Sequence, residues 1–517
     1  MLSSMFTKKW VKSTWWWLII IIVVGGVIRI PEFFAILGSE ELMTIKIIWY
    51  DEAYSSYFAQ HGLGDVVRLS GVDSTPMFFY LLLWVWQKIA GLSVVLLALL
   101  PFVFSVAAIP VVYLLGKQIF NHKTGLWAAW FFCISALNVD YATELRAYSL
   151  LVLLTSLSML FWWRLRDKKS WKNLLGYILF SLLVMYTHYT GFALVGAQAL
   201  LMFLYWKKDR LKTIGVHLLI ALMYVPQLFL FQRWSDIFGN KDILMVPYFS
   251  RAFSHGDLNA VFGFFYSIVF GQFAYYYLWT GFFGLLVFGG YVYLLKRKWS
   301  DVKLRCLLLM PSIGFVLLAA LKFIYAPKYF IVWTIPVCLI LAYLINSWTK
   351  RRYQHVFVVG VSFVLLIFVI FGYQVSEANQ HMYYAKSLFA EIEKNELPGD
   401  VVLTDHFNNL LMPWYYDGQA QEKFFFPDEE VLSRWRYWDY NIVNQDNVVQ
   451  LDELIEGVDR VWSFDYWPQG VSVQDPSGLV KERLVGQYKI IKSFEFPEGE
   501  LVNQKIILNL YQKNDNN

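Results

Sequence analysis

The sequence predicts a polytopic α-helical membrane protein with a separate α/β domain at its carboxy-terminal end. Of its 517 residues 58% are hydrophobic and only 16% are charged, and the mean hydropathy is +0.45. These values exclude an ordinary soluble domain. Apolar runs that are long enough to cross a bilayer recur as far as residue 373, and from about residue 376 Asp, Glu, Asn and Lys become frequent. We therefore predict a transmembrane domain over residues 1–375 and a soluble domain over residues 376–517.

The apolar runs predict about eleven membrane-spanning helices. They lie near residues 15–31, 92–116, 125–139, 147–163, 173–187, 190–206, 213–231, 262–294, 306–321, 328–346 and 355–373. The run at 262–294 is long enough to hold an interfacial helix before its span. The segment 76–86 is too short to cross the bilayer, so we expect it to form a helix along the outer leaflet with Pro76 at its first position.

Clusters of Lys and Arg predict the orientation of these spans. Every second loop is basic, and by the positive-inside rule these loops, together with the amino terminus, face the cytoplasm. The net charge of +5 comes from these clusters rather than from one basic surface, so it does not indicate nucleic-acid binding. The remaining loops and the carboxy-terminal domain then lie outside. The first span is preceded by lysines like a signal peptide, but no small-residue cleavage site follows it, so we expect it to stay uncleaved.

The carboxy-terminal segment shows the shorter periodicity of a small α/β sheet domain. We expect strands near 401–403, 461–464, 487–491 and 505–510, and a helix over 408–416. All three cysteines of the chain, Cys133, Cys306 and Cys338, fall instead within the apolar runs, so the sequence predicts no disulfide framework.

Polar residues that bear on function gather at the predicted outer ends of the spans. Charge beside the apolar phase is costly, and it is tolerated where it meets water, a cation or a substrate. The residues concerned are Asp51, Glu52, Glu144, Arg146, His188, Lys322 and Lys328. For the acid pair at 51–52 the alternative is a loop whose carboxylates face solvent. Acids at the rim rather than at the midplane favour an enzyme acting on a lipid-borne substrate, with a transporter or flippase of lipid-linked sugars as the alternative.

Several stretches, in this order and on this side, resemble the GT-C class of membrane glycosyltransferases. They are Asp51–Glu52, Ser74–Leu83, Thr143–Tyr148, Thr187–Gly191 and Lys328–Pro336. The branch they resemble contains the dolichyl-phosphate-mannose protein mannosyltransferases and the bacterial aminoarabinose transferases, over about residues 10–345. The resemblance implies transfer of a sugar from a polyprenyl-phosphate carrier to an outer acceptor, which could be a protein, a lipid or a cell-surface polymer. Lys328 stands where that branch usually has Arg, and Lys offers a point charge instead of a fork.

The resemblance also implies roles for the polar residues. Asp51 is predicted to be the base that deprotonates the acceptor, with inversion at the anomeric carbon, and Glu52 is the next candidate. No general acid is needed, because the leaving phosphate is already charged. Glu144 could orient the acceptor, hold a divalent ion with Asp51, or pair with Arg146. The predicted phosphate contacts are Arg146, Lys328, Lys322 and Tyr329.

Other residues are candidates for substrate or metal binding. The predicted substrate-binding residues are Tyr54, Asp73, Tyr148 and His188. Asp73 could instead cap the helix that follows it, and we favour the cap. His188 could donate to the phosphate, ligate a metal, or be a hydrogen-bonded structural residue. A divalent metal, if present, is expected at Asp51, Glu52, Glu144 and His188.

One further stretch, Trp414–Gly418, partly matches the Trp-Trp-Asp-x-Gly signature of oligosaccharyltransferases. That match leaves transfer to asparagine as an alternative. A Tyr-rich helix end followed by Asp-Gly also accounts for it.

Overall fold

The computed structural model forms two compact units. It describes residues 2–30, 48, 50–71, 75–230, 258–271, 277–320, 327–348, 351–375, 387–404, 412–414, 416–424, 455–467, 479–497 and 505–514. The first unit comprises residues 1–46 and 59–376, and the second comprises residues 47–58 and 377–517. The second unit therefore includes a short segment that the sequence analysis assigned to the transmembrane domain.

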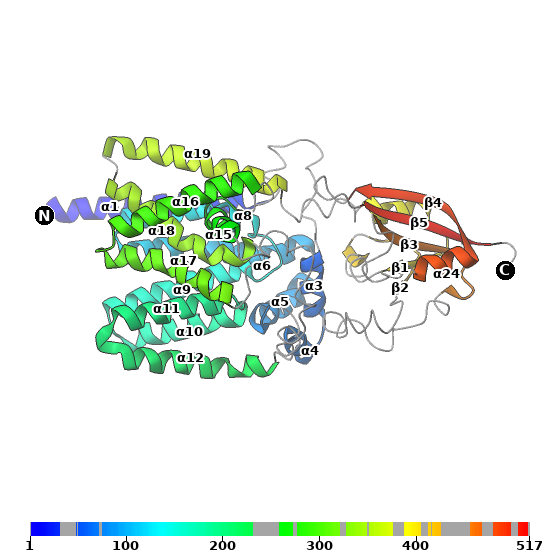
Figure 1. The fold of residues 1–517 in the computed structure, drawn as a ribbon, viewed down its shortest axis with the longest axis horizontal. Helices are drawn as coiled ribbons and strands as arrows, with labels where there is room; N and C mark the ends of the chain where they lie inside the picture. The colour runs from blue at the N-terminus through cyan, green and yellow to red at the C-terminus, as the bar shows by residue number, and fades with distance from the viewer. Residues whose placement is uncertain are drawn as a thin grey trace. The chain divides into compact units, whose positions relative to one another are not determined.

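Long helices lie side by side in the first unit (Figure 1). They are α1 (Leu2–Ile28), α6 (Val94–Ile119), α7 (His122–Cys133), α9 (Tyr148–Asp167), α10 (Trp171–Thr187), α11 (Gly191–Tyr205), α12 (Arg210–Leu230), α15 (Leu258–Phe270), α16 (Tyr277–Arg297), α17 (Val302–Ala320), α18 (Thr334–Trp348) and α19 (Arg351–Val375). Each predicted span coincides with at least one of them, and the run at 262–294 holds two, as expected. Within the described part of the chain, six helices are both long and apolar enough to cross a membrane. The predicted class, a polytopic α-helical membrane protein, is confirmed.

The expected span at 125–139 is wrong in one respect, because α7 ends at Cys133 and a separate short helix, α8 (Ala136–Asp140), follows it. A helix end exposes carbonyl groups that need partners. The buried guanidinium of Arg29 donates to the carbonyl oxygens of Phe132, at 3.4 Å, and Cys133, at 2.8 Å. Its Nε also donates to Ser105 Oγ of α6 at 2.8 Å. The break between α7 and α8 is therefore stabilised by a charge from the end of α1.

Asn138 of α8 fixes the next few residues in place. Its Nδ2 donates to Ser135 Oγ and to Thr334 Oγ1 of α18, both at 2.9 Å. Asn138 is 3% exposed, so its side chain can find partners only within the protein. These bonds hold the start of the segment that leads into α9, where two candidate site residues lie.

Between α1 and α6 the described residues form three short helices: α3 (Tyr50–Gln60), α4 (Leu63–Ser70) and α5 (Met77–Ala90). The expected interfacial helix is α5, although it begins at Met77, because Pro76 is extended and stands just before the first turn. Its 14 residues are about 21 Å long, short of the hydrocarbon thickness of a bilayer. Tyr80 on one face is fully buried, whereas Ile89 on another is exposed. This is the two-faced pattern of an interfacial helix.

The second unit contains a five-stranded mixed sheet with the order β2-β1-β3-β5-β4. Its strands are β1 (Val401–Thr404), β2 (Gln421–Phe424), β3 (Arg460–Trp467), β4 (Tyr488–Pro497) and β5 (Lys505–Lys513). β1 runs parallel to β2 and β3, while β5 is antiparallel to β3 and β4. Together with α24 (Leu479–Gln487), the sheet confirms the predicted α/β domain. Of the helix expected at 408–416, only residues 412–414 are described as helical, and residues 405–411 and 415 lie outside the described part.

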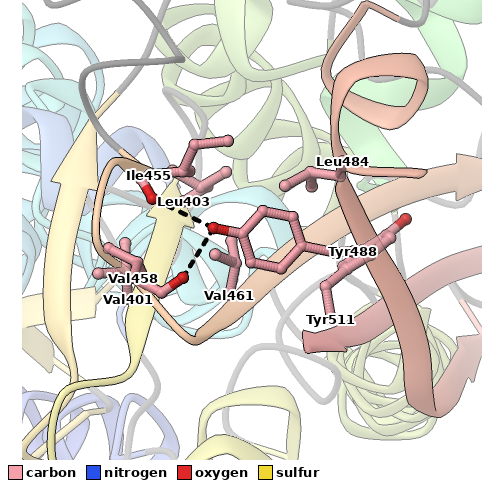
Figure 2. Close-up of a cluster of buried hydrophobic side chains, with 8 residues drawn as sticks. All are labelled: Val401, Leu403, Ile455, Val458, Val461, Leu484, Tyr488 and Tyr511. Atoms are coloured by element: carbon pink, nitrogen blue, oxygen red, sulfur yellow. Dashed lines mark hydrogen bonds between the residues drawn. The ribbon is translucent and has the colours of Figure 1, made fainter. Parts of the chain in front are cut away.

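A cluster of buried side chains joins α24 to the sheet (Figure 2). The ring of Tyr488 lies among aliphatic residues, and its hydroxyl faces the carbonyl oxygens of Ile455, at 3.1 Å, and Val458, at 2.8 Å. Its polar end is thus satisfied inside an apolar core. Alternating inward residues of β1 and β3, namely Val401, Leu403 and Val461, complete the packing.

Candidate functional site

The segment between α8 and α9 carries two buried charged residues. Glu144 is 7% exposed and Arg146 is 6% exposed. The backbone holds them in a tight turn, because the Arg146 N–H donates to the Glu144 carbonyl oxygen at 2.7 Å. Ser149 Oγ donates to the Tyr141 carbonyl oxygen, also at 2.7 Å, and ties the turn to the first residues of α9. Buried charges are retained where partners or ligands compensate them, so this turn is a strong candidate for a functional site.

Tyr80 of α5 positions the Arg146 side chain. Arg146 Nη1 donates to the Tyr80 hydroxyl oxygen at 3.2 Å. The Tyr80 ring is fully buried and packs against Phe79, with ring centroids 5.9 Å apart. The packed ring therefore fixes the position of the hydroxyl oxygen that accepts from the guanidinium.

Lys328 brings a second buried cation to the same place. It is 6% exposed, and its Nζ lies 6.0 Å from the centroid of the Tyr148 ring. This distance is at the outer limit of a cation–π contact. Lys328 lies in η3 (Pro327–Trp333), the 3-10 helix that leads into α18. The prediction that Arg146 and Lys328 lie near one another agrees with this arrangement, since the charges of both act on Tyr148, the first residue of α9, and on His188.

A glycine allows η3 to approach α17 closely. A Cβ atom at Gly314 would lie 2.0 Å from Cζ2 of the Trp333 indole, closer than any real contact. Trp333 is fully buried there, and Thr334 Oγ1 donates to the Ile331 carbonyl oxygen at 2.7 Å to close the turn into α18. Because Gly314 has no side chain, α17 leaves room for Trp333, and the 3-10 helix that carries Lys328 can pack in this position.

The His188 ring packs against two tyrosine rings, those of Tyr148 and Tyr329. Its ring centroid is 5.6 Å from that of Tyr148 and 5.5 Å from that of Tyr329. Its Nδ1 accepts a hydrogen bond from the Thr190 backbone N–H at 3.2 Å and lies 2.9 Å from Thr190 Oγ1. Its Nε2 is buried and has no hydrogen-bond partner among the described residues.

Burial lowers the pKa of His188 to about 3, and the charges of Arg146 and Lys328 act in the same direction. The imidazole is therefore neutral at physiological pH. We refer below to Arg146, His188 and Lys328, which border the Tyr148 ring, as the cationic cluster.

The acid pair is placed differently from our expectation. Asp51 and Glu52 lie in the first turn of α3 rather than in a loop. Acidic residues at this position interact favourably with the helix dipole, which gives a local reason for the helix to begin here. Glu52 is 1% exposed, so it is not an acid facing solvent, whereas Asp51 is half-buried. Residues 50–58 of α3 belong to the second unit, and the cationic cluster belongs to the first.

The remaining predicted site residues lie outside the cationic cluster or outside the described part of the chain. Tyr54 is buried, and its ring packs on Phe58 of its own helix with centroids 4.5 Å apart. Asp73 and Lys322 lie outside the described residues. No group of three or more His, Cys, Asp or Glu side chains within the described ranges is placed to hold a metal ion. The three cysteines are buried and free, in agreement with their expected place in the core.

The stretch Trp414–Gly418 has a structural explanation in its described residues. The carboxylate of Glu396 accepts hydrogen bonds from the backbone N–H groups of Gln419, at 2.8 Å, and Ala420, at 3.1 Å. It also accepts one from the Tyr416 hydroxyl. Glu393 accepts another from the Asp417 N–H at 2.8 Å. Tyr416 and Asp417 therefore stabilise a loop that is fastened to two glutamates.

Sequence reasoning missed two residues that contact the cationic cluster, Tyr80 and Thr190, and one buried acid, Asp140. Tyr80 stands in an apolar run and was interpreted as part of an interfacial helix, and Thr190 lies within the stretch Thr187–Gly191 but was given no role. Asp140 opens the 140–146 stretch, yet it was given no role. Both of its carboxylate oxygens are buried without a hydrogen-bond partner in the described part of the chain, and burial raises its pKa to about 8. The position of Asp140 at the very end of an apolar run could have indicated a buried carboxylate.

Comparisons with known proteins support the fold. Residues 73–230 match a family profile described as dolichyl-phosphate-mannose-protein mannosyltransferase, and this range includes Glu144, Arg146 and His188. The structure of ArnT from Cupriavidus metallidurans in the apo state matches with a TM-score of 0.57 and 12% identity, over 97% of this chain and 98% of that one. The structure of ArnT from the same organism bound to undecaprenyl phosphate matches with a TM-score of 0.55 and 11% identity, over 95% and 97%.

This chain has the GT-C fold. The resemblance found in the sequence is thereby confirmed at the level of fold, over nearly the whole chain and not only over residues 10–345. A search of curated protein sequences found no match. The match to ArnT covers 97% of this chain, so it includes both the helical unit and the carboxy-terminal sheet domain.

Proposed function

We propose that the chain is a membrane glycosyltransferase that takes a sugar from a polyprenyl-phosphate donor. The observation that carries this proposal is the cationic cluster. Arg146 and Lys328 are both buried, and both act electrostatically on the neutral His188, which packs against the Tyr148 and Tyr329 rings. Two buried cations bind a phosphate well, because a charged acceptor compensates their desolvation. The matches to a mannosyltransferase family and to a protein solved with undecaprenyl phosphate point to the same class of donor.

The leaving group determines what the protein has to supply. In the proposed reaction the acceptor oxygen bonds to the anomeric carbon, and the bond from that carbon to the phosphate oxygen breaks. The electron pair leaves with the polyprenyl phosphate. Because this phosphate is already ionised, it needs stabilisation by cations and no proton from a general acid. Arg146 provides a fork of donors for it, and Lys328 provides a point charge.

Asp51 is our proposed base. It would take the proton of the acceptor hydroxyl, and a direct attack would invert the anomeric centre. Its half-buried carboxylate in the first turn of α3 leaves room for an incoming hydroxyl, whereas the neighbouring Glu52 is almost fully buried. Successive residues of a helix point about 100° apart, so the two carboxylates serve different surroundings. Glu144 is proposed to orient the acceptor or to hold Arg146 in place.

The membrane arrangement follows from the charge bias of the loops. We propose that the amino terminus is cytoplasmic and that the sheet domain lies outside, as the alternating basic loops indicate. The acceptor would then be a protein, a lipid or a cell-surface polymer on that side. A cysteine introduced at residue 390 should react with an impermeant thiol reagent in intact cells. Protection of that cysteine until the membrane is broken would reverse the orientation.

The test of the function uses the purified full-length chain and a panel of prenyl-phosphate sugars. We expect one donor to lose its sugar to an acceptor in a membrane extract. Asp51→Asn should abolish transfer while it still binds that donor, and Glu52→Gln tests the next candidate base on the same helix. Unaltered transfer by Asp51→Asn would remove Asp51 from the mechanism. Donor that crosses the membrane without losing its sugar would refute the transferase.

Whether sugar transfer requires a divalent ion can be tested separately by chelation. If Glu144 and Asp51 share an ion, exhaustive chelation should lower transfer and added metal should restore it. Full activity after chelation would leave Glu144 with a positioning role alone.

A further inference from the structure

We propose that His188 donates a hydrogen bond from Nε2–H to the donor phosphate as a neutral imidazole, so that it neither ligates a metal nor carries charge. This inference rests on the proposed function and deepens it. It assigns to the phosphate site a third donor that differs in kind from the two cations. The contacts of the two ring nitrogens and the burial of the ring lead to it.

The first step is the hydrogen bond at Nδ1. A backbone N–H is always a donor, and that of Thr190 lies 3.2 Å from His188 Nδ1. Nδ1 must therefore present its lone pair. In a neutral imidazole the single ring proton is then on Nε2. Thr190 Oγ1, 2.9 Å from Nδ1, can donate to the same lone pair and strengthens this choice of tautomer.

The second step excludes the charged form. An imidazolium would place a proton on Nδ1, directly opposite the Thr190 N–H. The ring is 2% exposed, so water does not solvate a charge there, and Arg146 and Lys328 act against a third positive charge. His188 is thus a fixed donor at Nε2.

The third step concerns what Nε2–H binds. It is buried and without a partner in the described part of the chain, a state that costs free energy until an acceptor arrives. The Tyr148 and Tyr329 rings both pack against the imidazole and limit its rotation. An acceptor near two buried cations is favoured if it is anionic, and phosphate oxygen meets this requirement better than a sugar hydroxyl.

The same inference argues against one of the alternatives that the sequence left open for His188. A metal bound at Nε2 would need the lone pair of that nitrogen, and the Thr190 N–H assigns the lone pair to Nδ1. Nδ1 itself is occupied by this hydrogen bond. His188 is therefore unsuited to the metal role that was one of its predicted alternatives.

The experiment measures binding of a prenyl methyl phosphate diester to the purified full-length chain in lipid nanodiscs. A diester keeps one charge between pH 5 and 8, unlike a monoester with its second pKa near 6. We expect His188→Ala to weaken binding roughly ten- to a hundredfold, as expected for a lost hydrogen bond to a charged group. His188→Gln, which keeps a neutral N–H donor, should retain most of the affinity. Wild-type affinity should stay flat over this pH range.

His217 provides a matched control. It is a second histidine whose Nδ1 contacts the Thr213 carbonyl oxygen at 2.7 Å and whose Nε2 contacts the Tyr177 hydroxyl at 2.9 Å. Both of its nitrogens are satisfied, so His217→Gln should leave diester binding unchanged. Nitrogen-15 NMR of labelled histidine, with His188→Gln to assign the resonance, should show the Nε2-protonated tautomer.

The outcomes separate the two proposals. If wild type binds the diester and His188→Ala binds it equally well, the His188 inference fails and the proposed function stands. Affinity that rises as the pH falls, and does so only with His188 present, would identify an imidazolium. Affinity that disappears on chelation in wild type but not in His188→Ala would identify a metal ligand. If wild type binds neither the diester nor inorganic phosphate, both proposals fail.

Discussion

Removing the hydroxyl of Tyr80 tests whether Arg146 holds the donor phosphate. In Tyr80→Phe the ring stays, and only the oxygen that accepts from Arg146 Nη1 at 3.2 Å is lost. Tyr80 is 0% exposed and Arg146 is 6% exposed, so water has little access to replace that oxygen. A hydrogen bond to a charged group contributes about 1.5–3 kcal/mol, and loss of an acceptor in a buried site gives most of that cost. This corresponds to roughly a ten- to hundredfold change in an equilibrium constant.

Initial rates over a range of donor concentrations are the assay. If Tyr80 positions Arg146 toward the phosphate, we expect KM for the donor to rise by that factor while kcat falls less. The control is Tyr177→Phe, which removes an equally buried hydroxyl that bonds His217 at 2.9 Å. It should lower Tm to a similar extent and leave KM unchanged. A donor KM within twofold of wild type in Tyr80→Phe, or an equal rise in both variants, would refute the reasoning.

Three further predictions concern single residues. Lys328→Arg should keep donor binding within about fivefold of wild type and Lys328→Ala should lose ten- to a hundredfold, because the buried cation is removed only in the second; equal losses would argue against a phosphate role. Arg29→Met should lower Tm in detergent by several degrees, because the Cys133 carbonyl that ends α7 loses the donor it has in Arg29; an unchanged Tm would show that this break needs no cation. Asp140 has a pKa raised to about 8 by burial, so the folded protein binds the extra proton and loses stability as the pH rises from about 4 to 8. Asp140→Asn should therefore exceed wild type in Tm at pH 8 and match it at pH 4, and equal slopes of Tm against pH would contradict this.

Much of the helical unit could be predicted because an apolar run of sufficient length has few alternatives to a helix. The break at Ile134 and Ser135 could not, since neither Pro nor Gly marks it and its stabilising partner, Arg29, lies about a hundred residues earlier in the chain. The loop expected at Asp51 and Glu52 is a helix because its acids favour an amino-terminal turn. A stretch of mixed acids and aromatic residues shows no apolar periodicity that would have indicated this helix.

The grouping of Arg146, His188 and Lys328 could be predicted from the sequence, but the contacts that hold these side chains could not. Loop sidedness was enough to group Arg146, His188 and Lys328, because each stands at the same predicted end of a span. The tautomer of His188 depends on one backbone N–H, and the support of Arg146 depends on Tyr80, a residue of an apolar run. Contacts of this kind join elements that are distant in sequence. No local sequence pattern therefore predicts these contacts.

The guanidinium at residue 29 also has a consequence for biosynthesis. Its partners outside α1 are made 76 to 104 residues after it. The newly inserted first helix therefore carries an uncompensated charge until the ribosome has produced α6 and α7. We expect this helix to stay beside the translocation channel during that interval and to enter the lipid only together with the hairpin that completes it.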